Sequence, residues 1–255
     1  NEQDTPEADG ERTVLPLFDG VVTTSRYAQQ AVVDEGVPAD RTGVVAPGLD
    51  APYRAPVSEG ATRETPRFLT VANLLPGKGL RTFVDRLDTL ADLNWSWTLV
   101  GDDTLNPDFA TALYDRIRSS PIADRVTLAG TVPTDALRSQ YDRADVFVLP
   151  SRFETCSMAT REAMARGCPV VGYAVGGLPD NFGDAVASGA TPAGRLVPPN
   201  RPAALADALR ALLTDADRRT RMGAAARAQS RSFPTWDEAG AHFRSVVQAF
   251  LSSSR

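Results

Sequence analysis

The sequence predicts an α/β protein with one complete doubly wound, Rossmann-like domain and a fragment of a second. From Val14 onward, short β-branched runs alternate with amphipathic segments of about 10 to 15 residues, which is typical of a parallel sheet covered by helices. Residues 67–232 contain enough of these units for a whole domain. Residues 12–50 supply only two strands and one helix, which is too little for a core of their own.

The first elements along the chain are a strand at 20–24, a helix at 26–35 and a strand at 43–46. Ser25 is a suitable N-cap for the helix, and Gly36 is placed to end it. We therefore expect residues 1–50 to be the C-terminal remnant of another Rossmann-like domain. The polar stretch 1–12 resembles a cut or a loop more than a domain start.

Residues 51–66 are rich in Pro, Ala and Gly without periodicity, so they are predicted to be a linker. The domain at 67–232 follows, and strands and helices alternate along it. Its predicted strands are 67–71, 96–100, 125–129, 145–149, 169–173 and 194–197, and the helices between them are 80–92, 107–119, 134–143 and 156–166.

Three helices are predicted after the last strand. The final one, at 235–251, carries apolar side chains at helical spacing and needs a surface to pack against. We expect residues 233–255 to cross back to the first fragment. The apolar residues are Trp236, Phe243, Val246, Val247 and Phe250.

Composition narrows the classes of function. The net charge of -5 comes from well-mixed signs, which argues against nucleic acid as the main partner. No apolar run approaches the roughly 20 residues of a membrane span, so no transmembrane segment is predicted, although peripheral membrane contact stays open. Both cysteines lie in one predicted buried unit, which favours a reducing compartment and a cytoplasmic location. The single histidine, His242, leaves no histidine cluster for a metal site or a Ser-His-Asp triad.

The most informative motif runs from a strand end at Pro150 to a buried strand at Val171. Glu154 lies in the loop after the first strand, and Glu162 lies on the next helix with seven residues between the two. Ligands of open α/β sheets bind at this edge, where a helix N-terminus offers free amides to a phosphate. Ionised carboxylates only accept hydrogen bonds, so the two glutamates suit sugar hydroxyls on either side of a diphosphate. The alternative is a pair of solvated glutamates on an ordinary Rossmann helix.

This pattern, Glu154 followed by the run EAMARGCPVV that starts at Glu162, resembles the motif of retaining glycosyltransferase family 4. Members of that family have the GT-B fold. The resemblance implies that Glu154 contacts the donor hexose and that Glu162 contacts the nucleotide ribose. It also implies that residues 67–232 are the donor-binding domain and that most of the N-terminal acceptor domain is missing from this chain.

The activity implied by the resemblance is transfer of a hexose from a nucleoside diphosphate sugar, a UDP- or GDP-sugar, to a hydroxyl of a glycan, lipid or small molecule. The anomeric configuration would be retained, and no metal or other cofactor is expected. Glu154 and Lys78 are the catalytic candidates, because Lys78 and the helix after Glu154 would stabilise charge on the leaving diphosphate.

Lys78 lies in a second matching segment, a strand, a Pro-Gly turn and a helix start at 67–80. The resemblance implies that this lysine reaches the donor diphosphate as a compact positive charge. Of the 27 basic residues it is the only lysine. Family members often carry a second phosphate-binding arginine where this chain has Asn73, which offers only a neutral hydrogen bond. A solvent-exposed surface lysine is the alternative.

The remaining binding candidates lie at the same predicted sheet edge. Gly101 and Asp102 follow the strand at 96–100, near where the family binds the base and phosphates. Because the Asp102-Asp103 pair ends a Rossmann-type strand, we do not interpret it as a metal site. Gly176 and Gly177 resemble the family's glycine loop, where glycine lets the backbone approach a ligand closely.

Three more candidates, Cys156, Ser157 and Met158, lie where the motif's helix begins. Ser157 replaces a family glycine, so the donor sugar could differ from that of well-known members. The position at a helix N-terminus predicts a lowered pKa for the Cys156 thiol.

There are two alternative functions. One is a non-catalytic module that binds a nucleotide sugar and depends on a separate acceptor domain. The other, a nicotinamide-binding protein, is disfavoured because no Gly-x-Gly-x-x-Gly follows any predicted strand.

Overall fold

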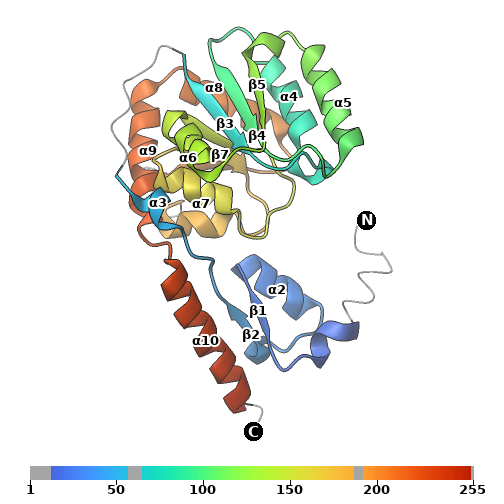
Figure 1. Ribbon diagram of the computed structural model, residues 1–255, viewed down its shortest axis with the longest axis vertical. Coiled ribbons are helices and arrows are strands. Elements are labelled where there is room, and N and C mark those ends of the chain that lie inside the picture. The colour runs from blue at the N-terminus through green and yellow to red at the C-terminus, as the bar shows by residue number, and fades with distance from the viewer. Residues whose placement is uncertain (1–12, 57–64, 187–191, 254–255) are drawn as a thin grey trace. The chain divides into compact units, whose positions relative to one another are not determined.

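The computed structural model describes residues 13–56, 65–186 and 192–253 (Figure 1). The chain divides into two compact units, Ala51–Ser232 and the combination of Asn1–Asp50 with Phe233–Arg255. The polar stretch 1–12 and part of the predicted linker, 57–64, lie outside the described residues.

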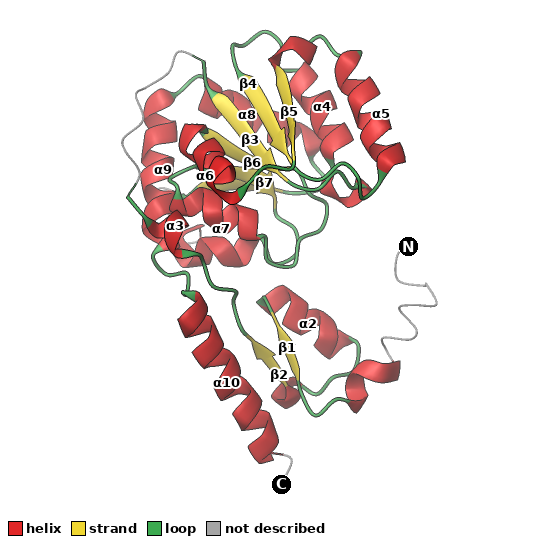
Figure 2. Cartoon of the chain, viewed as in Figure 1, coloured by secondary structure: helices red, strands yellow, loops and turns green. Residues whose placement is uncertain are grey.

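The larger unit is a six-stranded parallel sheet with helices on both faces (Figure 2). Its strands are β3 (Arg67–Val71), β4 (Ser96–Val100), β5 (Val126–Gly130), β6 (Val146–Leu149), β7 (Val170–Tyr173) and β8 (Gly194–Val197). Their spatial order is β5-β4-β3-β6-β7-β8, which is the doubly wound arrangement. The order reverses between β3 and β6, so the loops after these two strands flank the position where such sheets bind ligands.

The helices of the larger unit follow the predicted alternation. They are α3 (Ala51–Arg54), α4 (Leu80–Asp88), α5 (Pro107–Arg118), α6 (Thr134–Arg143), α7 (Met158–Ala165), α8 (Pro202–Leu213) and α9 (Ala216–Ser230), with 3-10 turns at Pro76–Lys78, Ala123–Arg125 and Pro179–Val186. Every residue of β6 and β7 is buried, as expected for strands covered on both faces. In the core, the rings of Phe83 and Trp97 meet edge to face with centroids 5.1 Å apart.

The smaller unit contains β1 (Val21–Thr23) and β2 (Thr42–Val44), paired in parallel, with α2 (Arg26–Asp34) between them. A 3-10 turn at Leu15–Leu17 precedes β1, and another at Ala39–Arg41 precedes β2. Ser25 caps α2, because its hydroxyl accepts from the amide of Ala28 at 3.1 Å. The last helix, α10 (Trp236–Ser253), belongs to this unit.

Two glycines of the smaller unit, Gly20 just before β1 and Gly43 in β2, allow α10 to pack closely. A Cβ on Gly20 would lie 2.2 Å from the ring of Phe250, and one on Gly43 would lie 2.4 Å from Val246. Val246 and Phe250 of the predicted apolar stripe therefore pack within this unit, whereas Trp236 and Phe243 are exposed, 54% and 48%.

Most predicted bounds shift by one or two residues in the structure, and three differences in the larger unit are informative. The helix α4 ends at Asp88 rather than at residue 92, and turns follow it. The helix α7 begins at Met158 rather than at Cys156, because Ser157 has a left-handed backbone. The predicted linker contains α3 with Tyr53 buried; a helix of one turn is too short to show a periodic pattern.

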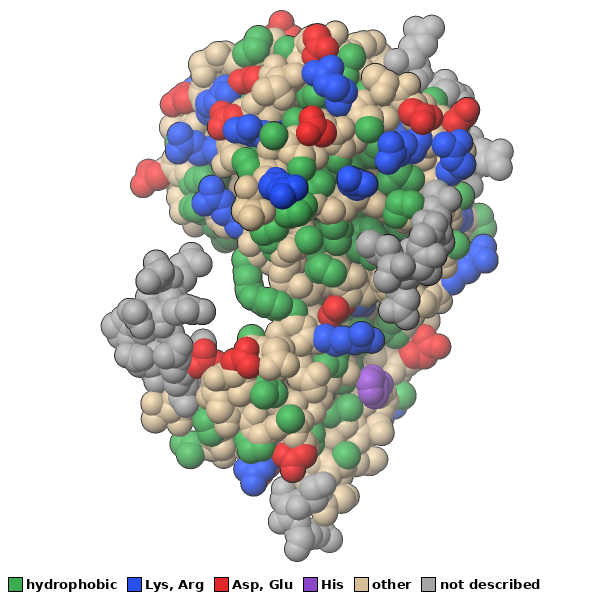
Figure 3. All heavy atoms as spheres, turned by 180° about the vertical axis from the view of Figure 1, so that it is seen from behind, with side chains coloured by type: hydrophobic (Ala, Val, Ile, Leu, Met, Phe, Trp, Pro, Cys, Tyr) green, Lys and Arg blue, Asp and Glu red, His purple; other side chains and the backbone are tan. Residues whose placement is uncertain are grey.

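None of the helices in the described part of the chain is long and apolar enough to cross a membrane. On the face drawn in Figure 3, basic and acidic side chains are interspersed over the larger unit. His242 is exposed on α10.

Candidate functional site

Two loops meet where the strand order reverses. After β3, the turn at Pro76–Lys78 brings the Nζ of Lys78 to 2.7 Å from Oε1 of Glu154, which follows β6. The Glu154 side chain is only 9% exposed, and the Lys78 side chain is 30% exposed. The chain thus places its single ammonium and a nearly buried carboxylate in contact at the ligand-binding edge of the sheet. We call these two residues the switch-point pair.

Backbone contacts fix the two loops that carry the pair. Gly79 has a φ of +66°, and a Cβ there would lie 2.1 Å from the carbonyl oxygen of Pro150. The amide of Arg152 donates to the carbonyl of Gly77 at 2.9 Å. Only a glycine at position 79 allows this approach, so the distance between Lys78 and Glu154 is set by the backbone as well as by their side chains.

The glycine loop after β7 packs against the backbone of Glu154. The amide of Gly177 donates to the Glu154 carbonyl at 2.8 Å, and a Cβ on Gly176 would lie 1.9 Å from the same oxygen. The close backbone approach that the sequence predicted for these glycines is therefore, in the structure, an approach to the Glu154 loop. Their direct contact with a donor stays a prediction.

A buried pair of polar side chains also holds this loop. Nδ2 of Asn181 donates to the carbonyl of Cys156 at 2.7 Å, and Oδ1 of Asn181 accepts from Nε of Arg161 at 2.8 Å. Both side chains are buried. Neither residue was predicted from the sequence, because their pairing joins α7 to the turn after β7 and leaves no local pattern.

The helix α7 starts from a strained residue. Ser157 has a φ of +61°, and it is the only non-glycine residue with a positive φ in the part of the chain that the structure describes. Its hydroxyl caps the helix by accepting from the amide of Thr160 at 3.4 Å. Met158, the half-buried first residue, opens the helix. The first-turn amides have no partner within the helix and form its positive end.

The predicted lowering of the Cys156 pKa is wrong. Burial raises the pKa of this thiol, and the carboxylates of Asp180 and Glu154 act in the same direction, against the opposing effect of Arg161. Cys156 also lies two residues before the first residue of α7. Desolvation of the thiolate therefore outweighs any stabilisation by the helix end.

Glu162 is held from another element. The hydroxyl of Tyr141, on α6, donates to Oε2 of Glu162 at 2.8 Å. Tyr141 is fully buried, and burial, with a further contribution from the charge of Glu162, raises its pKa well above the usual value. The phenol is thus a protonated donor at neutral pH. Tyr141 was not predicted as part of the site.

The loops after β3 and β4 are tied together. Oδ1 of Asn73 accepts from the amide of Asp102 at 3.3 Å, and a Cβ on Gly101 would lie 1.9 Å from the carbonyl oxygen of Ala72. Hydrogen bonds from the hydroxyl and the amide of Thr104 lower the pKa of Asp102. Asn73, Gly101 and Asp102 lie together at the sheet edge, and their contacts hold the two loops to each other.

Two further features near these loops were not predicted. The carboxylate of Asp103 accepts from the hydroxyl of Tyr114 at 2.5 Å, and burial raises the pKa of Tyr114 to about 12.

A cavity of about 350 Å³ lies beside the Lys78 turn, and none of the predicted site residues lines it. It is lined by Pro76, Gly79, Arg81, Thr82, Asp85, Phe109, Arg116 and Arg152.

Comparison with known proteins gives consistent matches. The family model described as glycosyl transferases group 1 matches residues 55–229. A D-inositol 3-phosphate glycosyltransferase of Xylanimonas cellulosilytica is 34% identical over 256 residues, covering 93% of this chain and 60% of that protein. This chain therefore spans less than two thirds of the length of that relative.

Solved structures agree with the fold. Sucrose-phosphate synthase of Thermosynechococcus elongatus superposes with a TM-score of 0.84 at 25% identity, covering 99% of this chain and 64% of that one. The Anabaena protein Alr3699/HepE in complex with UDP and glucose superposes with a TM-score of 0.82 at 19% identity, covering 97% and 68%. The predicted GT-B fold class is confirmed.

Proposed function

Because the chain belongs to the glycosyl transferases of group 1, we propose that its larger unit binds a nucleoside diphosphate sugar for retaining transfer of the hexose to an acceptor hydroxyl. The observation that carries the proposal is the switch-point pair, in which Lys78 and Glu154 lie 2.7 Å apart where the strand order reverses. Doubly wound sheets bind nucleotides at this position.

In this proposal the donor diphosphate is held by Lys78 and the N-terminal end of α7. A compact ammonium and free helix amides both favour negative charge, and they favour it more as the leaving diphosphate gains charge. Glu154 accepts hydrogen bonds from hexose hydroxyls, and Glu162 accepts them from the ribose. Because these groups supply the positive charge, we propose that donor binding needs no divalent metal.

The acceptor, a glycan, a lipid or a small molecule, would be bound largely outside this donor-binding unit. The similarity to the Xylanimonas cellulosilytica protein, which is named D-inositol 3-phosphate glycosyltransferase, makes a phosphorylated polyol the first acceptor to test. Transfer from a UDP-sugar, followed by NMR of the anomeric proton, measures retention directly. An inverted product would refute the retaining assignment.

Thermal unfolding with UDP, GDP, ADP and their sugars tests the donor site. A ligand present at about 100 times its dissociation constant stabilises the folded chain by about 2.7 kcal/mol. We expect one nucleoside diphosphate to stabilise wild type, with and without EDTA, and to stabilise Lys78→Met much less. Failure of all three nucleotides to stabilise the chain would refute the proposal.

The exposed ion pair between Asp92 and Arg210, 2.7 Å apart in the same unit, offers matched controls. Asp92→Asn and Arg210→Met should keep the full nucleotide-dependent stabilisation, because neither residue lies at the switch point. Glu154→Gln should keep UDP binding but lose the extra stabilisation given by the hexose of the donor. If Glu154→Gln binds the complete donor like wild type, Glu154 does not hold the hexose.

A further inference from the structure

The carboxylate of Glu162 is held by a residue that the known motif does not include. Oε2 of Glu162 accepts from the hydroxyl of Tyr141 at 2.8 Å. A glutamate side chain rotates about three bonds, so a hydroxyl that grips one oxygen restricts the orientation of the whole carboxylate. A single hydrogen bond occupies one of about four acceptor positions of a carboxylate, so this grip is compatible with binding a ligand hydroxyl.

The ring of Tyr141 is itself fixed. Tyr53 meets it edge to face and Phe147 meets it at a tilt, both with centroids 5.9 Å away. The carbonyl of Tyr141 accepts from the thiol of Cys168 at 3.1 Å. Tyr141 is fully buried, so its hydroxyl has a constant position relative to the sheet.

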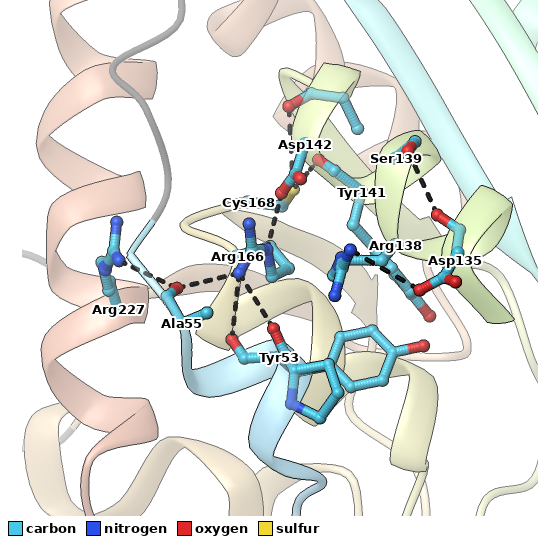
Figure 4. A network of polar contacts seen from close by, with 12 residues as sticks. Tyr53, Ala55, Asp135, Arg138, Ser139, Tyr141, Asp142, Arg166, Cys168 and Arg227 are labelled. Carbon is cyan, nitrogen blue, oxygen red and sulfur yellow. Dashed lines mark hydrogen bonds and ion pairs between the residues drawn. The ribbon is translucent and has the colours of Figure 1, made fainter.

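Arg166 secures the segment that carries Tyr53 (Figure 4). Nη1 of Arg166 donates to the carbonyls of Pro52, Tyr53 and Ala55 at 3.3, 3.4 and 2.9 Å. Nε of the same guanidinium lies 2.6 Å from Oδ1 of Asp142, and the Arg166 side chain is only 4% exposed. Arg166, the C-cap residue of α7, follows Glu162 by four residues, so the carboxylate and the residue that anchors its support lie one turn apart.

We propose that Tyr141 is a positioning residue for Glu162, orienting its carboxylate toward the ribose hydroxyls of a nucleoside diphosphate, with Arg166 holding residues 52–55 behind the tyrosine ring. This inference rests on the proposed function, because it takes the ligand of Glu162 to be the ribose. It adds a residue on α6 and a segment before β3 to the determinants of nucleotide recognition.

The test compares ribose with deoxyribose ligands in wild type and in Tyr141→Phe. Titration calorimetry gives the dissociation constants of UDP, 2′-deoxy-UDP and 3′-deoxy-UDP, or of the matching GDP or ADP set if that base binds. A hydrogen bond to a charged group predicts that wild type prefers ribose by about tenfold over one of the deoxy ligands. In Tyr141→Phe we expect this preference to fall to about threefold or less, since a loosely oriented carboxylate discriminates poorly.

Tyr114→Phe is the matched control, because Tyr114 also donates to a carboxylate, that of Asp103. It should leave the ribose preference at the wild-type value even if overall affinity changes. A role of Tyr141 in folding alone would weaken all three ligands equally and leave the preference intact. If Tyr141→Phe does not fold, Arg166→Lys, which keeps the charge and loosens the hold on the three carbonyls, is expected to lower the same preference.

The outcomes separate the two proposals. If wild type binds no nucleoside diphosphate, both the proposed function and the positioning role of Tyr141 are refuted. If wild type prefers ribose and the folded variant keeps that preference, the diphosphate site stands and the positioning role of Tyr141 is overturned. The positioning role is also overturned if wild type binds the nucleotide but does not distinguish ribose from either deoxy form.

Discussion

Replacing Arg166 by methionine should destabilise the larger unit severely. Methionine retains most of the apolar stem of the arginine, so the main loss is polar. The Arg166 side chain, 4% exposed, pairs with the side chain of Asp142, which is 32% exposed. Breaking a buried ion pair costs about 3 to 5 kcal/mol. Because Asp142 is partly exposed, the lower end of this range applies. The Tyr53 carbonyl, on a residue only 2% exposed, also loses a donor, which adds about 1 kcal/mol.

The sum, about 4 kcal/mol, corresponds to a decrease in Tm of roughly 12 °C for a protein of this size. Differential scanning calorimetry measures it, with Arg210→Met as the comparison. Arg210 also pairs with an aspartate and donates to a carbonyl, that of Thr89, but it lies at the surface. Exposed pairs contribute little, so this variant should lose no more than about 3 °C. Equal decreases in the two variants would show that burial of Arg166 does not determine its contribution.

Three further predictions concern the loop around Glu154. Ser157→Gly should raise the free energy of unfolding by about 0.5 kcal/mol in urea titrations. Relief of the left-handed strain exceeds the loss of the cap together with the added freedom of the unfolded chain. Ser157→Ala keeps the strain and loses the cap, so it should lower the free energy of unfolding by about 1 kcal/mol. A destabilised glycine variant would contradict the strain argument. Gly176→Ala should lower the free energy of unfolding by at least about 2 kcal/mol, because the new Cβ would collide with the Glu154 carbonyl. Gly130 also has a positive φ, but no atom lies within 4 Å of its Cβ position, so Gly130→Ala should cost about 1 kcal/mol. Equal losses in the two variants would exclude the collision as the cause. Because burial raises the pKa of Cys156, iodoacetamide should label it more slowly at pH 8 than in the unfolded chain, and the rate should keep rising above the pH at which an ordinary thiol levels off. Mass spectrometry of its peptide gives the rate, and fast labelling at pH 7 would show that the thiol is accessible and ionised.

The sheet was predictable because its strands leave a strong local pattern. The runs Val146–Leu149 and Val170–Tyr173 are continuously apolar and buried on both faces, and parallel strands joined by helices leave few topologies. The same rule explains why Lys78 and Glu154 could be assigned to one site. They follow the two strands that flank the reversal of strand order, although 76 residues separate them.

The support behind the site could not be predicted in this way. Tyr141 and Glu162 join two helices, and Asn181 joins a turn to the end of the Glu154 loop. Because the partners lie far apart in the sequence, no local sequence pattern predicts either contact. The Cys156 pKa was predicted in the wrong direction because a helix end and burial act oppositely on a thiol, and burial depends on the tertiary packing. The helix α3 was missed because its anchors, the guanidinium of Arg166 and the ring of Tyr141, lie far along the chain.

The contact between Lys78 and Glu154 has a consequence for a catalytic cycle of the proposed kind. In the proposed cycle, the Glu154 carboxylate is the counterion of the Lys78 ammonium before the donor binds and again after the nucleotide product dissociates. In such a cycle an incoming diphosphate would compete with an anion already in contact with the lysine, which would limit how tightly the product is retained. The pair would therefore favour turnover over affinity.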